Sequence, residues 1–201
     1  MDKKYIVILA AGASTRFPGS KLLYKLHGKP MVLHSIEAAL NSRLADRVVI
    51  VLGHDFNRIH QVVEGYDLDV VLNDEYWRGM SSSVRLASSK LTNPGAIAFH
   101  PADVPLVSPR AFDTVLEKVA SGALIAIAGF KGRKGHPIAF HGLLHPELMY
   151  VSEDGRGLKQ VVERYKRHIQ VVDVGEPGVL IDVDLVSDLD RLYSVYAGRR
   201  M

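Results

Sequence analysis

The sequence has no cysteine among its 201 residues. Disulfide bonds, zinc–thiolate sites, iron–sulfur clusters and cysteine nucleophiles are therefore excluded. Any metal ion bound by this chain needs oxygen or histidine ligands, which favours a hard divalent cation.

Long apolar runs and clustered charges of one sign are also missing. No apolar run approaches the roughly 18 to 20 residues that span a bilayer, and the charged start, Met1-Asp2-Lys3-Lys4, lacks a secretory pattern. The 25 lysines and arginines against 22 acidic residues leave a formal net charge of only +3, and the basic residues are dispersed. We therefore expect a cytoplasmic protein with no membrane or nucleic-acid partner and a small anionic substrate.

The two common glycine-rich nucleotide motifs are absent as well. Gly12 and Gly19 are too far apart for a Walker loop, no Gly-Lys-Ser/Thr follows them, and Gly-x-Gly-x-x-Gly does not occur. These absences count against a P-loop NTPase and a dinucleotide-dependent oxidoreductase. The length, with 47% hydrophobic and 23% charged residues, predicts a single globular domain over residues 1–201.

A short apolar run followed by a small-residue loop is the most informative feature that is present. Tyr5 to Leu9 has no polar alternation, as in a strand buried on both faces. Ala10 to Gly12 then let backbone N–H groups approach a ligand, and Ser14, Arg16 and Lys21 add a donor and two cations. The loop suits a triphosphate. An ordinary strand-to-helix turn with two solvated cations is the alternative.

The rest of the chain alternates apolar strands with amphipathic helices. The expected strands are 48–52, 69–72, 96–100, 124–130, 138–140 and 169–174, and the expected helices are 31–41, 56–65, one beginning at residue 81, 112–119, 143–149 and 161–165. This alternation predicts an α/β fold with a doubly wound, mostly parallel sheet. Its ligands bind at the carboxyl ends of the strands, where Gly53 also lies.

Residues 73–86, NDEYWRGMSSSVRL, follow the third expected strand. Ser81 to Ser83 offer hydroxyls that can cap a helix whose apolar face carries Val84 and Leu86. By this reasoning Trp77 is a core aromatic residue beside a capped helix. A nucleotide-contacting segment is the alternative.

Asp103 comes directly after the buried strand 96–100, between Pro101 and Pro105. A carboxylate held there is well placed to bind a divalent cation against phosphate oxygens. The alternative is a structural aspartate that caps the helix beginning near Pro109, although Ser108 is closer to that position.

Two later segments carry further charged groups. The loop from Lys131 to Pro137 is glycine-rich and cationic, which predicts a mobile surface turn or an anion contact. Asp182 and Asp184 alternate with apolar residues, so on a strand both face one side, and one can complete a metal site with Asp103. Asp188 and Asp190 fall in the first turn of a terminal helix, where negative charge is favourable.

Four of these segments, in order, resemble motifs of nucleotidyltransferases similar to molybdenum cofactor cytidylyltransferase and its guanylyltransferase relative. LAAGASTRFPGSK resembles L-A-A/G-G-x-S-x-R-M-G-x-x-K, with Phe17-Pro18 in place of the methionine. Residues 73–86 resemble N-x-x-W/Y-x-x-G-M-x-x-S-L/V, DVP resembles D-x-P, and DVDLVSDL resembles D-I-D-T-P-E-D-L. Residues 135–137 and 152–159 match further, less specific family segments.

The resemblance implies a Rossmann-like fold of the nucleotide-diphospho-sugar transferase type. It implies transfer of CMP from CTP to the molybdopterin cofactor with release of pyrophosphate, and Mg²⁺ bound by Asp103 and Asp184, with Asp182 in reserve. The catalytic residues implied are Arg16, Lys21 and Asp103. The substrate contacts implied are Leu9, Ala10, Ala11, Gly12, Ser14, Gly53, Asn73, Ser82, Ser83 and, on the acceptor side, His136.

The substrates and partners implied leave alternatives open. Ala11 stands where guanylyltransferase-like relatives tend to have a second glycine, and its methyl group favours CTP over the larger GTP. A sugar or polyol phosphate is another acceptor on the same fold, and a non-catalytic carrier of the molybdenum cofactor is the alternative from another class. A molybdoenzyme or chaperone that receives the product is the partner implied.

Overall fold

The centre of the protein is a seven-stranded, mostly parallel sheet. The computed structural model describes residues 2–198, with side chains up to residue 195. The strands follow the order β5-β4-β1-β6-β8-β7-β9, and all of them except β8 run in one direction. They are β1 (Lys3–Ala10), β4 (Arg47–Leu52), β5 (Asp69–Leu72), β6 (Pro94–Pro101), β7 (Ile125–Phe130), β8 (Arg133–His141) and β9 (Ile169–Asp173).

Over residues 2–198, seven α-helices and several short 3-10 turns lie between and after the strands. The helices are α1 (Met31–Leu40), α2 (Phe56–Val63), α3 (Met80–Lys90), α4 (Pro109–Ala120), α5 (His145–Leu148), α6 (Leu158–Arg164) and α7 (Asp188–Gly198). The 3-10 turns used below are η1 (Lys21–Leu23), η2 (Tyr76–Arg78), η3 (Gly142–Leu144) and η5 (Pro177–Leu180). Within residues 2–198, none of the helices is long and apolar enough to cross a bilayer.

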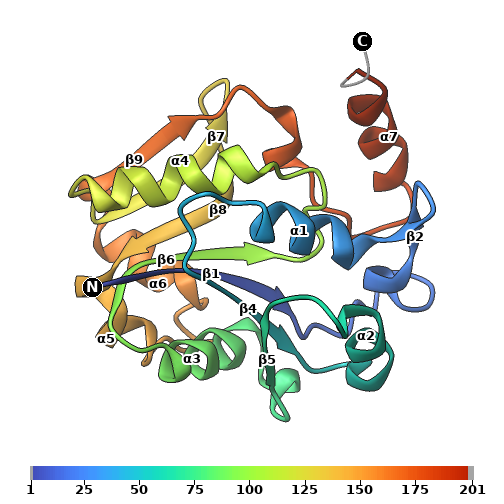
Figure 1. Cartoon of the computed structure of the whole chain (residues 1–201), viewed down its shortest axis with the longest axis horizontal. Helices are drawn as coiled ribbons and strands as arrows, with labels where there is room; N and C mark the ends of the chain where they lie inside the picture. The colour runs from blue at the N-terminus through green and yellow to red at the C-terminus, as the bar shows by residue number, and fades with distance from the viewer. Residues whose placement is uncertain (1, 199–201) are drawn as a thin grey trace.

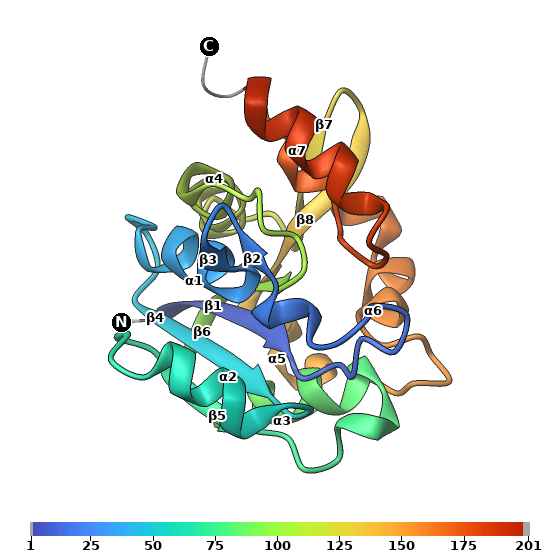
Figure 2. The same ribbon diagram turned by 90° about the vertical axis from the view of Figure 1, so that its right-hand side faces the viewer.

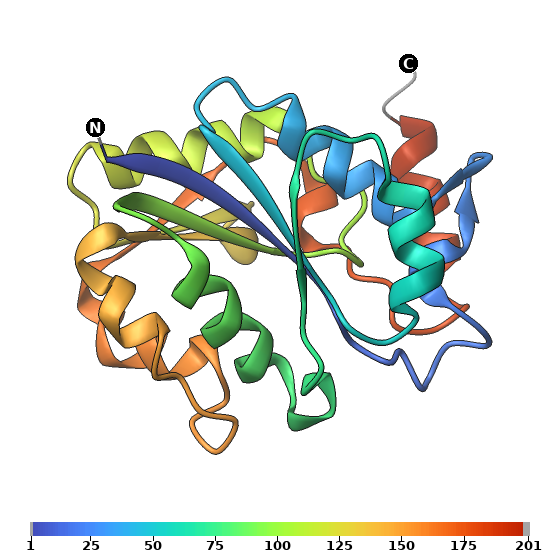
Figure 3. The same cartoon turned by 60° about the horizontal axis from the view of Figure 1, so that its bottom comes forward.

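Helices cover both faces of the sheet. Successive side chains of a strand point to opposite faces, so Ile6 and Ile8 of β1 pack with α1, α2 and α4, whereas Tyr5 and Val7 pack on the side of α3, α5 and α6. Figures 1 and 3 show α1 and α4 on one side of the sheet and α3 on the other. The predicted doubly wound, mostly parallel sheet is confirmed.

The carboxyl ends of the central strands bring distant loops together. The carbonyl of Leu9 at the end of β1 accepts the N–H of Ala102 at 3.0 Å, and the carbonyl of Leu52 at the end of β4 accepts the N–H of Asn73 at 2.8 Å. The loops after β1, β4, β5 and β6 therefore meet at one edge, as ligand-binding loops do in open α/β sheets.

A third, smaller apolar cluster lies beyond this edge. It packs the loop after β1 and the β2–β3 hairpin (Lys25–Leu26 and Lys29–Pro30) against the C-terminal helix α7, and Figures 1 and 2 show α7 beside β2. Its buried members are Phe17, Leu26, Met31, Leu106, Ile181, Val183, Leu189 and Leu192. This cluster holds the C-terminal segment against the loop after β1.

Three segments differ from the sequence expectations. Residues 177–180 form η5 and residues 181–184 form no strand, because the segment makes a backbone contact with the loop after β6 and joins no sheet ladder. The expected mobile loop 131–137 is a tight turn at Lys131-Gly132 followed by the start of β8, which pairs with β7. The expected helix 143–149 is divided between η3 and the four-residue α5.

Candidate active site

The loop after β1 turns sharply and places its two cations differently. Ser14 has φ +49°, and its carbonyl accepts the N–H of Phe17 at 2.9 Å, which closes a turn. Phe17 is buried with its ring edge-on to Tyr24 at 5.7 Å, so the residue that departs from the family pattern anchors the loop. Arg16 is consequently exposed, whereas Lys21 on η1 is only 5% exposed.

Asp103 is held at the end of β6 by its neighbours. Ala102 and Val104 are each 1% exposed, and the Asp103 carbonyl accepts the N–H of Val183 at 3.0 Å. The Asp103 side chain itself reaches the open edge of the sheet. The helix-capping alternative for Asp103 is wrong, because the Ser108 hydroxyl accepts the N–H of Ala111 and caps α4.

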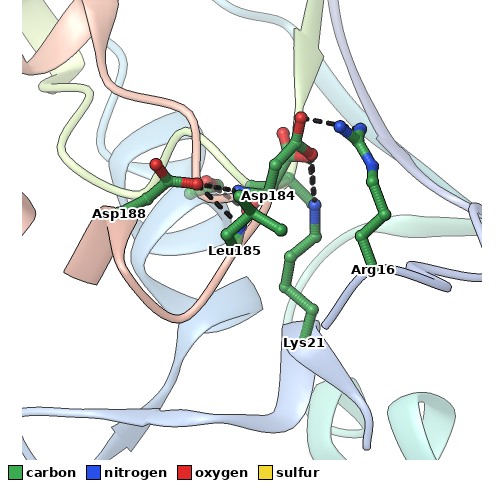
Figure 4. Close-up of polar contacts among 8 residues, drawn as sticks. Arg16, Lys21, Asp184, Leu185 and Asp188 are labelled. Carbon is green, nitrogen blue, oxygen red and sulfur yellow. Dashed lines mark hydrogen bonds and ion pairs between the residues drawn. The ribbon is translucent and has the colours of Figure 1, made fainter. Parts of the chain in front are cut away.

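Four charged side chains from three distant segments form one network. The Lys21 ammonium group donates to Asp103 at 2.7 Å and to Asp184 at 3.2 Å, and Arg16 donates to the second oxygen of Asp184 at 2.8 Å. Figure 4 shows Arg16 and Lys21 converging on Asp184. Two cations and two carboxylates offset one another, so the almost completely buried ammonium group of Lys21 has charged partners.

Asp188 fixes the position of Asp184. Its carboxylate accepts the backbone N–H groups of Leu185 at 2.7 Å and Asp184 at 2.8 Å, at the start of α7 (Figure 4). These two backbone donors lower the pKa of the Asp188 carboxyl below its usual value. The expected placement of Asp188 in the first turn of the terminal helix is confirmed, and its work there is to hold the loop that carries Asp184.

Asp103 and Asp184 together fit a divalent cation. Both carboxylates lie within hydrogen-bond distance of one ammonium nitrogen, so their oxygens already converge on a point of positive charge. Within the described residues there is no cluster of three or more histidine and carboxylate groups able to bind a metal by themselves. Mg²⁺ is commonly held by only one or two carboxylates, with waters and substrate phosphates completing its shell, so two are sufficient.

A pocket of about 460 Å³, here called the donor pocket, opens over this network. Its floor is the loop after β1 with the four charged groups, and its other end is formed by η2 and the start of α3. The residues lining it are Leu9, Ala10, Ala11, Gly12, Ala13, Ser14, Thr15, Arg16, Lys21, Leu22, Tyr76, Trp77, Gly79, Met80, Ser83, Pro101, Asp103 and Asp184. Ten of the sequence-predicted site residues therefore lie around one cavity.

Three other predicted site residues lie behind the wall of the donor pocket. Asn73 is buried and donates to the hydroxyls of Ser82 at 2.8 Å and Ser83 at 2.9 Å, so it fixes the first turn of α3. Gly53 allows Tyr76 to pack closely against the backbone, because a Cβ atom at position 53 would lie 2.7 Å from Cβ of Tyr76. The structure gives Asn73, Ser82 and Gly53 contacts that shape the pocket from outside.

The start of α3 differs from the expected serine cap. The helix begins at Met80, and none of the three serine hydroxyls accepts from its free N–H groups. Glu153, from the loop before α6, accepts the N–H of Ser81 at 3.0 Å, and its carboxylate lies directly against Gly79. A carboxylate far along the chain therefore caps this helix, which spacing rules for local caps could not reveal.

The predicted core position of Trp77 is wrong. Trp77 is 70% exposed on η2, at the rim of the donor pocket. Tyr76 and Met80, which were given no role by sequence reasoning, line the same rim. The sequence signals for this rim are the adjacent aromatic residues Tyr76 and Trp77 and the match of residues 73–86 to a family motif.

A second cavity of about 460 Å³, here called the acceptor pocket, adjoins the donor pocket through Met80, which lines both. Its walls are mainly apolar and its rim carries cations from β8, α6 and the loop before α6. The residues lining it are Met80, Val104, Ile127, Lys134, Gly135, His136, Ile138, Arg156, Leu158, Lys159, Val162, Val179, Leu180 and Asp182. Asp182 and Asp184 thus line different pockets, although Ile181 and Val183 are buried and neither aspartate is, as the predicted alternation requires.

His136 lies at the base of the acceptor pocket. Its Nδ1 atom is enclosed and has no hydrogen-bond partner within the described part of the chain. Burial lowers the pKa of His136, and the charges of Asp103 and Asp182 oppose that shift only in part. Behind it, 6.4 Å between ring centres, burial lowers the pKa of His100 to about 3. Both rings are therefore neutral near pH 7.

The sequence has known relatives. Residues 6–169 match the model of the MobA-like NTP transferase domain. A probable molybdenum cofactor guanylyltransferase from Thermococcus sibiricus is 33% identical over 165 residues, which cover 82% of this chain and 73% of that protein. The bifunctional protein GlmU from Thermus thermophilus is 37% identical over 124 residues, which cover 60% of this chain and only 27% of GlmU.

The fold is also found among solved structures. Rv0371c from Mycobacterium tuberculosis superposes with a TM-score of 0.83 at 23% identity, covering 96% of this chain and 98% of that one. The same protein has been solved in complex with manganese, where the TM-score is 0.79 at 22% identity, with 96% and 98% of the two chains covered. On the match over residues 6–169 and the Thermococcus relative, this chain belongs to the family of MobA-like NTP transferase domains.

Proposed function

We propose that this protein transfers CMP from CTP to the phosphate of the molybdopterin cofactor and releases pyrophosphate. One observation carries the proposal. A pocket with a charged floor and an aromatic end adjoins, through the single residue Met80, an apolar pocket rimmed by cations. A nucleoside triphosphate matches the first pocket, and an acceptor with an apolar body and an anionic end matches the second.

The reaction proposed needs no covalent intermediate with the protein. An oxygen of the acceptor phosphate forms a bond to the α-phosphorus of CTP, and the bond from that phosphorus to the pyrophosphate oxygen breaks. Catalysis is then mainly positioning and stabilisation of charge. Arg16 and Lys21, on the loop lining the donor pocket, would stabilise the negative charge that develops on the leaving pyrophosphate.

Asp103 and Asp184 would hold a divalent cation, which we propose to be Mg²⁺. Once bound, the ion would supply positive charge to the triphosphate oxygens. In the free protein the two carboxylates engage Lys21 and Arg16. Turning the carboxylates to a metal ion would release both side chains for the phosphates of the donor. The manganese complex of Rv0371c supports a divalent cation on this fold.

The base proposed is cytosine, on the strength of Ala11. Its methyl group lines the donor pocket and sits close behind Gly53, where an added Cβ would lie 3.0 Å from it. A fixed methyl at this position leaves less room for a purine. GTP is the second candidate, because a relative that is similar over 82% of this chain is a probable guanylyltransferase.

The acceptor proposed follows from the chemistry of the acceptor pocket. Ile127, Ile138 and Leu158 give it broad apolar walls, and exposed Lys134, Arg156 and Lys159 surround its mouth. A sugar phosphate would need polar partners for its hydroxyl groups on those walls, since burying unpaired hydroxyls is costly. A flat heterocycle with a phosphate, as in molybdopterin, fits apolar walls and a cationic rim better.

Pyrophosphate release tests the proposal. CTP, GTP, ATP and UTP are each incubated with Mg²⁺, with and without molybdopterin cofactor, and with a sugar phosphate as the control acceptor. Release from CTP only in the presence of the cofactor is the expected result. Pyrophosphate release from GTP instead of CTP would support guanylyl transfer. Release only with the sugar phosphate would show that molybdopterin is not the acceptor.

A further inference from the structure

Trp77 is the single tryptophan of the chain, and its side chain is 70% exposed. It lies on η2 at the rim of the donor pocket, together with Met80, which is 54% exposed. A large aromatic ring left in water at the mouth of a charged pocket gains apolar contact only when something covers it.

The segment that carries Trp77 is firmly held. The N–H of Glu75 donates to the side chain of Asn73 at 3.0 Å, and the N–H of Gly79 donates to the carbonyl of Tyr76 at 3.2 Å. The Ser82 hydroxyl also donates to the carbonyl of Glu75 at 3.2 Å. The exposure of Trp77 is therefore a consequence of a bonded turn that presents the ring outward.

The donor pocket has a charged end and an aromatic end. Arg16 and Lys21 belong to the network of Asp184 and Asp103, which follows β6, whereas Tyr76 lies against Gly53, which follows β4, and β4 and β6 flank β1 on opposite sides. The Tyr76 ring is edge-on to Trp77 at 5.6 Å and to His54 at 5.8 Å, so it supports the tryptophan from behind. A nucleoside triphosphate with its phosphates on the cations extends its base towards the aromatic end.

We propose that Trp77 stacks on the base of the donor nucleotide and forms the outer wall of the nucleoside site. This inference rests on the proposed function, because it requires a nucleotide in the donor pocket. Every base has a π-face, so stacking contributes affinity for all four nucleoside triphosphates and does not choose between CTP and GTP. Base choice is left to groups that contact the base edges.

Tryptophan fluorescence, excited at a wavelength that tyrosine does not absorb, tests this directly, because Trp77 is the single tryptophan of the sequence. CTP and GTP are titrated into the full chain with Mg²⁺, and inorganic tripolyphosphate is titrated as a probe that lacks a base. Quenching by both nucleotides and none by tripolyphosphate is expected. Calorimetry on the same samples records binding independently of the ring.

Variants complete the test. Trp77→Ala should weaken the binding of CTP and of GTP by a similar factor, roughly tenfold, and Trp77→Phe should recover most of the lost affinity. Tyr150→Ala is the matched control, since Tyr150 is 79% exposed and lines neither pocket, and it should bind nucleotides as the unaltered protein does.

The outcomes separate the inference from the proposed function. Calorimetric binding of CTP without a fluorescence change, or unaltered affinity in Trp77→Ala, overturns the stacking role and leaves nucleotidyl transfer standing. A calorimetric signal from neither CTP nor GTP overturns the proposed function, and the stacking role with it.

Discussion

The donor and acceptor pockets have the same volume, about 460 Å³, and opposite chemistry. In the donor pocket the charge is at the floor, where Lys21 is almost buried and bonded to Asp103 and Asp184. In the acceptor pocket the charge is at the rim, where Lys134 and Arg156 are exposed above apolar walls. Buried, fixed charges serve the reacting groups, whereas exposed charges attract and hold a ligand.

This comparison divides the expected effects of substitutions. If the proposed function holds, changes at the floor of the donor pocket should lower kcat, because they remove groups proposed to act in the transition state. Changes at the rim of the acceptor pocket should raise the KM of the acceptor and leave kcat nearly unchanged.

The largest effect is expected for Asp103→Asn. Removing this charge weakens the divalent-cation site and leaves Lys21 without one of its two partners, so kcat for pyrophosphate release should fall roughly 10³-fold. Far-UV circular dichroism should show an intact fold, because Asp103 lies at the edge of the sheet.

Asp182→Asn is the matched control for that variant. Asp182 lines the acceptor pocket, so its loss should change the KM of the acceptor and preserve kcat within a few-fold. An equal loss of kcat in both variants would contradict the division of Asp182 and Asp184 between the two pockets.

The free energy of unfolding at acid pH should depend on His100, which lies behind His136 at the acceptor pocket. Burial lowers the pKa of His100 from 6.5 to about 3, so the folded protein keeps the ring neutral while the unfolded chain binds a proton below pH 6.5. The contribution of His100 to the free energy of unfolding should therefore be fully present above that pH and fall by up to about 1.4 kcal/mol per pH unit between pH 6.5 and 3.

Denaturant titrations at pH 7, 6, 5 and 4 measure this dependence. His100→Gln should give a shallower fall than the unaltered protein, and the exposed His168→Gln should follow the unaltered protein. Identical slopes for all three proteins would show that His100 does not bind its proton on unfolding.

Gly12→Ala should affect nucleotide binding in the donor pocket without affecting the stability of the fold. An added Cβ at Gly12 meets no protein atom within 4 Å, so its methyl group would enter only the space expected for the nucleotide. The KM for CTP should rise roughly tenfold, since close approach of the backbone is lost, and thermal stability should be unchanged.

Gly53→Ala is the contrasting variant. Its Cβ would lie 2.7 Å from Cβ of Tyr76, so the protein should lose about 1 to 3 kcal/mol of stability by overpacking. If thermal denaturation instead showed Gly12→Ala to be the less stable of the two, the space above Gly12 would be filled by protein.

Arg156→Ala should act on the acceptor alone. The Arg156 side chain is exposed at the rim of the acceptor pocket, and removing it should raise the KM of the acceptor several-fold while the KM for CTP stays constant. The same KM should rise with ionic strength, because exposed charges are screened. Lys118→Ala, on the exposed surface of α4, is the control and should change neither the KM of the acceptor nor the KM for CTP. A rise in the KM for CTP with Arg156→Ala would instead place Arg156 in the donor site.

The smallest effect is expected at Glu153, which links the loop before α6 to the start of α3. Glu153→Ala removes the group that accepts the Ser81 N–H at the start of α3, which should cost about 1 kcal/mol of stability and raise the KM of both substrates about threefold. Glu153→Gln keeps an accepting oxygen and should restore most of the loss. Failure of glutamine to restore it would mean that the charge, and not the hydrogen bond, holds the junction.

Much of the fold could be predicted because its signals are local. Val48 to Leu52 and Asp69 to Leu72 were expected as strands, and the structure has β4 and β5 there. Unbroken apolar runs predict strands buried on both faces, and the intervening amphipathic segments predict the helices that cover them. The expected helix 143–149 is divided between η3 and α5, because a short apolar segment does not distinguish one helix type from another.

Most of the residues predicted for the site line one pocket, but their arrangement around it was not foreseen. The loop 9–21, Asp103 and Asp184 were marked by their position after apolar runs and by family motifs, and the structure places them around one cavity. The exposed position of Trp77 and the capping of α3 by Glu153 were not foreseen. Both depend on contacts that no local spacing records.

The sequence by itself determined the alternation of strands and helices, and therefore which loops gather at one edge of the sheet. Only the tertiary structure decided that Arg16 bonds to a residue 168 positions away, that Lys21 lies between two carboxylates, and that Asp182 and Asp184 serve different pockets. The physical reason is that Ile181 and Val183 are buried in the apolar cluster beneath α7, which sets the path of this segment along both cavities without any strand pairing.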